Sequence, residues 1–280
     1  MDGGLIRLKA IVDSLPASEK KIAEYILNHP ERVVQATVSQ LSEWSGGSTA
    51  AIIRLCKSVD VSGFQELKLK IAGDLMGEQK QEYTEIRPND TIDNIIQSVS
   101  TNNIQSIRDT MKVIDPVLVE KAVDALERSD RLHFYGIGAS SLIAIDAQNK
   151  FMRINKTSFA FIDTHAQLMD ATALRPEDTV VCISYSGESS LVIQCMKYAK
   201  ESGCSTISIT RWSDNTLSSM ADIPLKITST ENEVRSGATS SRITQLNLID
   251  ILYLGVVSRN FEQSVRYLEK SRKAIRGSSH

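Results

Sequence analysis

The sequence predicts an α/β protein in which an all-α N-terminal domain with a helix-turn-helix precedes a doubly wound, five-stranded parallel sheet. Apolar residues recur at helical spacing up to residue 77, whereas short β-branched runs alternate with helical patterns beyond residue 91. Between these regions the chain is polar and aperiodic, which is typical of a linker. We therefore expect a first domain at 1–77, a linker at 78–90 and a second domain at 91–280.

Composition places the chain among globular proteins and excludes several other classes. It has 280 residues, of which 41% are hydrophobic and 24% charged, as in soluble domains. Its apolar runs are far shorter than the roughly 18 residues that span a bilayer, and its N-terminus lacks a signal-peptide pattern, so we expect no membrane partner and a cytoplasmic location. The net charge of −2 gives no overall case for nucleic acid, so that case must come from local basic residues.

The cysteines favour neither a disulfide framework nor a metal site. Cys56, Cys182, Cys195 and Cys204 show no Cys-x-x-Cys spacing and fall inside expected helices and strands. We therefore expect reduced thiols that act as small hydrophobes, and we expect no metal and no cofactor.

The N-terminal domain is predicted to be a series of helices. Helical spacing covers residues 5–14, 18–29 and 64–75, with Ser18 as the expected N-cap of the second helix. Between them, Thr37 and Gln40 resemble a capping box for a short helix, and Ser45-Gly46-Gly47 predicts a tight turn. Ser48 caps a further helix. Two short helices joined by a glycine turn form a helix-turn-helix.

The second helix of this pair has one face suited to a core and one suited to DNA. Its core face carries Ile52, Leu55, Cys56 and Val59. Its other face presents Ser48, Thr49, Ala50, Ile53, Arg54 and Lys57. In a major groove an arginine contacts guanine, small apolar side chains contact thymine methyls, and Ser48 and Lys57 can hold phosphates. A solvated helix of a small bundle is the alternative, which this pattern leaves open.

A family resemblance favours the DNA-binding interpretation. The segment Ser48–Lys57, followed by Gly63-Phe64-Gln65-Glu66-Leu67-Lys68, resembles the N-terminal domain of the RpiR family of bacterial transcriptional regulators. The resemblance covers about the first 77 residues. One departure is Asp60, where the family usually has glycine; aspartate tolerates a left-handed backbone better than most residues, so the departure affects local geometry only.

The second domain is predicted to alternate strands with helices. Strands are expected at 131–135, 158–162, 179–183, 206–209 and 223–227, and helices at 91–113, from 115 onward, and at 141–153, 165–173, 188–202, 214–221 and 261–276. Such alternation implies right-handed crossovers and a parallel sheet that is covered on both faces. The helix at 91–113 carries a long apolar stripe, which could pack on its own domain or form a dimer seam.

Serine-rich turns follow the first and third expected strands. They span Gly136–Ser141 and Ser184–Ser189, and each leads from a strand into a helix. Hydroxyls and the free N–H groups of a first helical turn together favour a phosphate, although serines at such a position can also be ordinary helix caps. Gly136-Ile137-Gly138 lacks the third glycine of a dinucleotide fingerprint, which we reject.

The two turns resemble the phosphate-binding signatures of the sugar isomerase (SIS) domain, a flavodoxin-like fold. The resemblance covers residues 115–258 and implies that a phosphosugar contacts Gly138, Ala139, Ser140, Ser184, Tyr185, Ser186 and Ser189. Tyr185 departs from the glutamine that the family often has. Residues 163–165 and 231–242 further resemble the MurR-type subgroup, which responds to N-acetylmuramic acid 6-phosphate. This implies sugar contacts from Thr164, His165, Glu231 and Arg242, although His165 could instead cap or pack a helix and Arg242 could form a surface ion pair.

The combination predicts a transcriptional regulator rather than an enzyme. We expect the helix-turn-helix to bind a palindromic double-stranded operator of carbohydrate catabolism genes, as a homodimer or homotetramer. We expect the SIS domain to bind a sugar phosphate effector, N-acetylmuramic acid 6-phosphate or another amino sugar 6-phosphate. The rival is a sugar-phosphate isomerase or lyase with Glu188, Asp163, Glu231 or His165 as general base. A third alternative is a purely structural dimerisation module.

Overall fold

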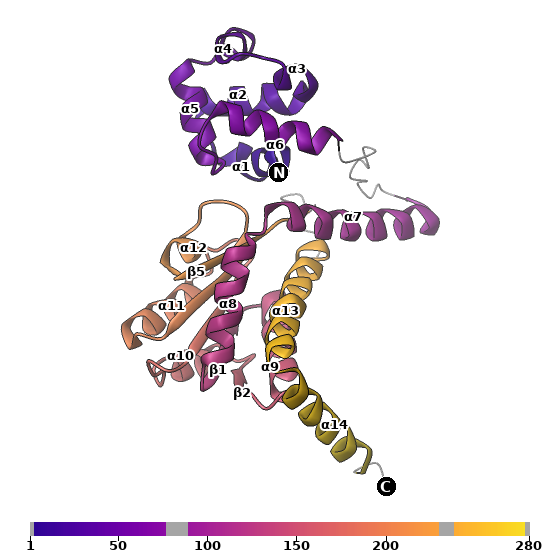
Figure 1. Cartoon of the computed structure of the whole chain (residues 1–280), viewed down its shortest axis with the longest axis vertical. Coiled ribbons are helices and arrows are strands. Elements are labelled where there is room, and N and C mark those ends of the chain that lie inside the picture. Colours follow the sequence, from indigo (N-terminus) through magenta and orange to yellow (C-terminus); the bar gives the residue numbers. More distant parts are fainter. Residues whose placement is uncertain (1–2, 77–88, 230–237, 278–280) are drawn as a thin grey trace. The chain divides into compact units, whose positions relative to one another are not determined.

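The computed structural model describes residues 3–76, 89–229 and 238–277, which form two compact units, Met1–Val113 and Ile114–His280 (Figure 1). The linker expected at 78–90 lies almost entirely outside the described residues. Helix α7, Ile92–Val113, is grouped with the first unit, whereas we expected it to lead the second domain. An amphipathic pattern fixes that a helix has an apolar side but not which neighbour it joins.

In the described residues of the first unit, all regular secondary structure is helical. It contains α1 (Gly4–Ile11), a short 3₁₀ turn (Val12–Ser14), α2 (Ala17–Asn28), α3 (Pro30–Val34), α4 (Val38–Ser45), α5 (Thr49–Ser58), α6 (Phe64–Met76) and α7. Two details differ from expectation. Pro16, not Ser18, is the N-cap of α2. Helix α2 ends at Asn28, and Pro30 begins a further helix, α3, that was not among the expected ones. A proline is tolerated at this position because it lacks only an N–H that is unpaired in a first turn anyway.

The expected helix-turn-helix is confirmed as α4, a turn and α5. Thr37 and Gln40 form a complete capping box, Gly46 adopts a left-handed φ of 64°, and the Ser48 hydroxyl accepts a hydrogen bond from the Ala51 N–H at 3.1 Å. The predicted core face of α5 is buried, with Ile52, Leu55, Cys56 and Val59 each exposed by 1% or less. Asp60 has a φ of 55°, the left-handed backbone for which glycine is otherwise preferred.

The second unit contains the predicted parallel sheet, in the order β2-β1-β3-β4-β5. The strands are β1 (Arg131–Gly136), β2 (Thr157–Ala160), β3 (Thr179–Ile183), β4 (Ser205–Arg211) and β5 (Ile223–Ile227). The helices are α8 (Pro116–Arg128), α9 (Ala139–Arg153), α10 (Thr164–Ala171), α11 (Ser190–Ser202), α12 (Thr216–Met220), α13 (Ser240–Arg259) and α14 (Phe261–Gly277). In the described part of the chain, no helix combines the length and apolarity needed to cross a membrane.

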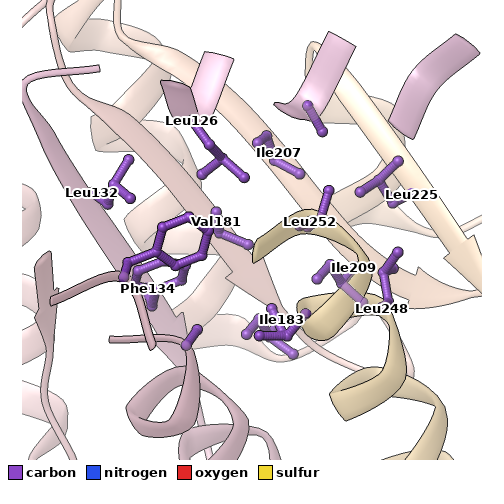
Figure 2. Packing of buried hydrophobic residues seen from close by; sticks show 14 of the residues in the cluster. Leu126, Leu132, Phe134, Val181, Ile183, Ile207, Ile209, Leu225, Leu248 and Leu252 are labelled. Carbon is purple, nitrogen blue, oxygen red and sulfur yellow. The ribbon is translucent and has the colours of Figure 1, made fainter. Parts of the chain in front are cut away.

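Helices cover both faces of the sheet. Residues of α8, α9 and α13 pack on one face, where Leu126, Leu248 and Leu252 meet the strands (Figure 2). Residues of α10, α11 and α12 pack on the other. Right-handed crossovers explain the division of the connecting helices. Helix α9 leads from β1 to β2, whereas α10, α11 and α12 lead in the opposite direction across the sheet, toward β3, β4 and β5, so they lie on the other face. Accordingly β3 is apolar on both faces, as expected of a parallel strand.

The loops that follow β3 and β4 are packed tightly against each other at Gly187. The Leu217 N–H donates to the Gly187 carbonyl at 3.0 Å, and a Cβ on Gly187 would lie 2.0 Å from Asn215 Oδ1. The Asn215 side chain is buried and cannot give way, since it accepts from the Ser218 N–H at 2.9 Å and donates to Thr210 and Ser213. Gly187 also has a φ of 73°. A side chain is therefore excluded here on two grounds.

Gly187→Ala should lower the free energy of unfolding of the second unit by about 2 to 4 kcal/mol, from backbone strain plus overpacking. Gly203→Ala is the matched control, because Gly203 has a φ of 76° with nothing within 4 Å of its added Cβ, and it should cost only about 1 kcal/mol. Urea unfolding can be followed by Trp212 fluorescence in a Trp44→Phe background, since the chain has two tryptophans. Equal costs for the two substitutions would contradict the packing argument.

Candidate functional site

The exposed face of α5 is the candidate DNA-binding surface. Its exposed residues are Ser48, at the N-cap, and Thr49, Ala50, Ile53, Arg54 and Lys57. Ile53 is 52% exposed, and an exposed apolar side chain on this face suits contact with thymine methyl groups. Ser48 uses its oxygen as an acceptor in the cap but keeps its O–H for donation to a phosphate. The six side chains predicted to contact DNA thus share one accessible surface.

Arg54 is held by a partner that sequence analysis did not identify. Its Nε donates to Glu19 Oε1 at 2.9 Å, and the Ser58 hydroxyl lies 3.4 Å from Glu19 Oε2. Glu19 belongs to α2 and its side chain is 6% exposed, whereas the Arg54 side chain is 54% exposed. The contact therefore joins a buried carboxylate to an arginine on the candidate DNA-binding face.

The candidate phosphate site lies where β1 and β3 end. In the parallel register, Gly136 of β1 pairs with Ile183 of β3, so the two serine turns leave the sheet at the same edge and at adjacent strands. The chain reaches β2 on one side of β1 and β3 on the other. Such a topological switch point is where ligands bind in open α/β sheets.

The first turn is shaped by close packing and by a glutamine. A Cβ on Gly136 would lie 2.6 Å from the Ser140 carbonyl oxygen, so glycine lets α9 begin directly above the strand. The Gln167 side chain, fully buried on α10, accepts from the Gly136 N–H at 3.2 Å and donates to the Gly136 carbonyl at 2.9 Å. Gln167 thereby satisfies the end of β1 as a further strand would. The sequence offered no signal for this role.

The hydroxyls of the first turn are largely buried. Ser141 donates to the Gly138 carbonyl at 2.7 Å, and Gly138, with a φ of 60°, is the N-cap of α9. The Ser140 hydroxyl lies 3.5 Å from Gln245 Oε1 of α13, so it has only a weak partner. Ala139 is the first residue of α9. Gly138, Ala139 and Ser140 therefore present backbone and a weakly bonded hydroxyl at the start of a helix.

The second turn leaves one hydroxyl uncommitted. Ser184 accepts from the Gly187 N–H at 3.2 Å, and Ser186 accepts from the Glu188 N–H at 3.3 Å. Ser189 is the N-cap of α11, but its side chain makes no capping bond. The sequence predicted a helix start near Glu188, but α11 begins at Ser190. The Glu188 side chain instead bonds to Thr216. The N–H groups of the first turn of α11 and the Ser189 hydroxyl are therefore the candidate anion-binding element of this turn.

Glu188 caps α12, the helix that follows β4. Its carboxylate accepts from the Thr216 N–H and from the Thr216 hydroxyl, each at 2.8 Å. These hydrogen bonds, the backbone one first, hold the pKa of Glu188 below its usual value. Tyr185 is also anchored, through a 2.7 Å hydrogen bond between its hydroxyl and Ser229. Glu188 therefore shapes the turn and stays ionised, and it is a poor proton acceptor.

The predicted sugar contacts are only partly brought together. Thr164 and His165 start α10, beyond the end of β2, where Asp163 caps the helix by accepting from the Ala166 N–H at 2.8 Å. His165 is exposed, and so is Arg242 in the first turn of α13. Gln245, on the next turn of α13, contacts Ser140, so this end of α13 borders the first serine turn. Glu231 lies outside the described residues, and its role stays a prediction.

The cysteines are all buried free thiols. Burial raises the pKa of the Cys195 thiol to about 12 and that of Cys56 to about 11. The thiolate is the reactive form, so these side chains are inert hydrophobes at neutral pH.

Known proteins resemble the whole chain. Residues 2–78 match the helix-turn-helix domain of the rpiR family, and residues 125–255 match the SIS domain. The Bacillus subtilis (strain 168) protein YbbH, described as an uncharacterised HTH-type transcriptional regulator, is 42% identical over 98% of this chain and 97% of its own length. The HTH-type transcriptional regulator HexR of Pseudomonas aeruginosa is 30% identical over 95% of this chain and 94% of its own.

A solved structure shares the fold over the full length. The Vibrio vulnificus NanR protein complexed with ManNAc-6P superposes with a TM-score of 0.61, at 23% identity, over 97% of each chain. Together with a helix-turn-helix that exposes a basic face and a sheet that joins two serine turns, these similarities settle the family. The chain belongs to the RpiR family of helix-turn-helix transcriptional regulators that carry an SIS domain.

Proposed function

We propose that the chain binds a palindromic operator through α5 and that an amino sugar 6-phosphate, bound at the serine turns, controls this binding. The observation that carries the proposal is the pairing of Gly136 with Ile183, which joins two helix-opening serine turns at one edge of the sheet. Effector and operator sites then lie in different units of one chain. A coupling free energy of about 1 to 3 kcal/mol would change operator affinity severalfold to a hundredfold.

The phosphate is the part of the effector that the site supports best. The N-terminus of the 13-residue helix α11 supplies unpaired N–H groups and a favourable dipole, and the free Ser189 hydroxyl adds a donor. For the sugar, support comes from the ManNAc-6P complex of Vibrio vulnificus NanR and from the resemblance of residues 163–165 to MurR-type regulators. Exposed His165 and Arg242 remain proposed sugar contacts.

The described candidates for a general base favour an effector site over a catalytic one. Glu188 and Asp163 each cap a helix with their carboxylates, and the pKa of Glu188 is lowered by the bonds from Thr216. A general base needs a free lone pair near the proton it removes and a pKa close to the operating pH. Two of the three described candidates, Glu188 and Asp163, are thus committed to helix caps, which supports ligand binding without turnover, and His165 is proposed as a sugar contact.

The proposal also requires at least a dimer, because a palindromic operator has two half-sites. Helix α7 supports this. Its large apolar side chains Ile92, Ile96, Ile104 and Met111 are between 49% and 70% exposed, and Val99 is 36% exposed. A stripe of this length is costly to leave in water. A second copy of the chain is its proposed occupant, since self-association aligns two identical recognition helices.

Arg54→Ala should weaken binding to a duplex selected in vitro with the wild-type chain by roughly 5- to 150-fold, because a bidentate contact to a base contributes about 1 to 3 kcal/mol. Lys197→Ala removes an equal charge from the exposed face of α11 and should leave affinity unchanged. Fluorescence anisotropy measures both. Unchanged affinity for the Arg54 variant would contradict the recognition-helix assignment.

Ser189→Ala should weaken binding of the effector by roughly 10- to 100-fold, since a hydrogen bond to a charged group contributes about 1.5 to 3 kcal/mol. Calorimetry with ManNAc-6P, N-acetylglucosamine 6-phosphate and N-acetylmuramic acid 6-phosphate measures this, with NMR to detect turnover. Ser202→Ala, at the other end of α11, loses a hydroxyl bonded to the Ala199 carbonyl and should bind normally. A sugar phosphate that is converted rather than returned intact would support the isomerase or lyase alternative.

Ile96→Glu should convert the oligomer to monomers in sedimentation velocity, because a charge would be placed in the proposed apolar seam of α7. Val117→Glu is the control, since Val117 is a single exposed apolar residue on α8, 62% accessible, and should leave the mass unchanged. A wild-type chain that sediments as a monomer would contradict the seam, as would an oligomer that the Ile96 variant retains.

A further inference from the structure

The contact between Glu19 and Arg54 ties the candidate DNA-binding face to a helix outside the helix-turn-helix. Glu19 lies in the first turn of α2, 35 residues before Arg54. A buried carboxylate is costly unless charged or polar groups satisfy it. The bond from Arg54 is the main one the structure shows to this carboxylate, because the single Ser58 hydroxyl hydrogen is shared between Glu19 Oε2 at 3.4 Å and the Arg54 carbonyl at 3.2 Å. Glu19 and Arg54 therefore constrain each other.

The geometry leaves the end of the guanidinium available. Only the Nε edge of Arg54 is engaged by Glu19, and among the described residues no group accepts from Nη1 or Nη2 of Arg54. A guanidinium has five N–H groups in one rigid plane, so fixing the Nε side also fixes the direction of the terminal pair. The side chain is 54% exposed, on the same face as Ala50, Ile53 and Lys57.

We infer that Glu19 is a positioning residue for sequence recognition: it orients Arg54 so that Nη1 and Nη2 contact O6 and N7 of one guanine in each half-site. The inference rests on the proposed role of α5 in DNA binding. A free arginine has several rotamers and contacts phosphates and bases alike, and ordering it at binding carries an entropy cost. An arginine held through Nε has met that cost during folding, and it favours the planar, bidentate contact that only guanine offers in the major groove.

The same carboxylate also lowers attraction to DNA of any sequence. Glu19 places a negative charge 2.9 Å from the Arg54 guanidinium, which reduces its pull on phosphates. Glu19 therefore raises the ratio of specific to non-specific affinity in two ways: it orients Arg54 toward guanine, and it weakens the attraction of Arg54 to phosphates. This combination separates recognition from simple structural support, because a folding defect would weaken both kinds of binding together.

The test compares Glu19→Ala, Glu19→Gln, Arg54→Ala and the Glu19→Ala/Arg54→Ala double variant in the full chain. The probes are a duplex selected in vitro with the wild-type chain and a scrambled duplex of equal composition. Glu19→Ala should reduce the affinity ratio between the two by roughly 10-fold or more, within the range of one bidentate base contact, while binding to the scrambled duplex stays equal or tightens. Glu19→Gln keeps an acceptor for Nε and should retain most of the ratio.

Two further measurements complete the test. Repeating the selection with the Glu19→Ala chain should relax the preference for guanine at one symmetry-related position per half-site and leave the others unchanged. The double variant should have the same affinity ratio as Arg54→Ala, because Glu19 acts through Arg54. Glu24→Ala is the control, since Glu24 is exposed on the same helix and loses the same charge; its ratio should match wild type.

Each outcome has a distinct meaning. A Glu19→Ala chain that keeps its affinity ratio and its guanine preference overturns the positioning role, and so does a fall in both affinities together with no change in their ratio. A double variant well below Arg54→Ala would show that Glu19 acts independently of Arg54 and would overturn the inference too. If Arg54→Ala itself leaves the ratio unchanged, the proposed recognition helix fails first, and the inference falls with it.

Discussion

The parallel pairing of β1 with β3 is the constraint on which the second unit depends. The register that opposes Gly136 to Ile183 ends both strands at one level, so two serine turns separated by more than forty residues of chain leave the sheet side by side. The strand order on either side of this pair also decides which helices cover which face. A one-residue shift of β3 would turn Val181 and Ile183 away from the core that they share with Leu248 and Leu252 (Figure 2), so burial enforces the register.

Around this edge, side chains are used mainly to hold backbone. Gln167 completes the end of β1, Asn215 and Glu188 cap α12, and Ser184 and Ser186 each accept from an N–H of their own turn. In the described residues, the Ser189 hydroxyl and the first N–H groups of α11 make no such bond, and the Ser140 hydroxyl has only a weak partner. Among the described residues, the candidate site offers fixed donors to an anion, and the carboxylates of Glu188 and Asp163 are committed to helix caps, which supports the proposed effector site.

In the first unit, too, a side chain holds a candidate binding group in place, but here the binding group is a cation, the Arg54 guanidinium. The apolar face of α5 is fully buried, which fixes the outward direction of Ile53, Arg54 and Lys57. Fixing a helix does not fix a long side chain, however, because arginine retains several rotamers on a solvated face. The Glu19 carboxylate supplies the missing restraint from α2. The proposed recognition of a base and the proposed binding of a phosphate would thus both use groups that the fold holds in place before the ligand arrives.

The sequence by itself determined most of the helices, the strands, the two faces of α5 and both serine turns, because these follow from local periodicity, capping and turn chemistry. The family resemblance singled out Asp60 as a position where glycine is usual and a left-handed backbone is tolerated, and Asp60 has a φ of 55°. Only the tertiary structure decided that Glu188 caps a distant helix, that Gln167 closes β1, that Glu19 holds Arg54 and that α7 is grouped with the first unit. These are single contacts between residues far apart in the chain, and a lone carboxylate or amide has no period from which its partner can be inferred.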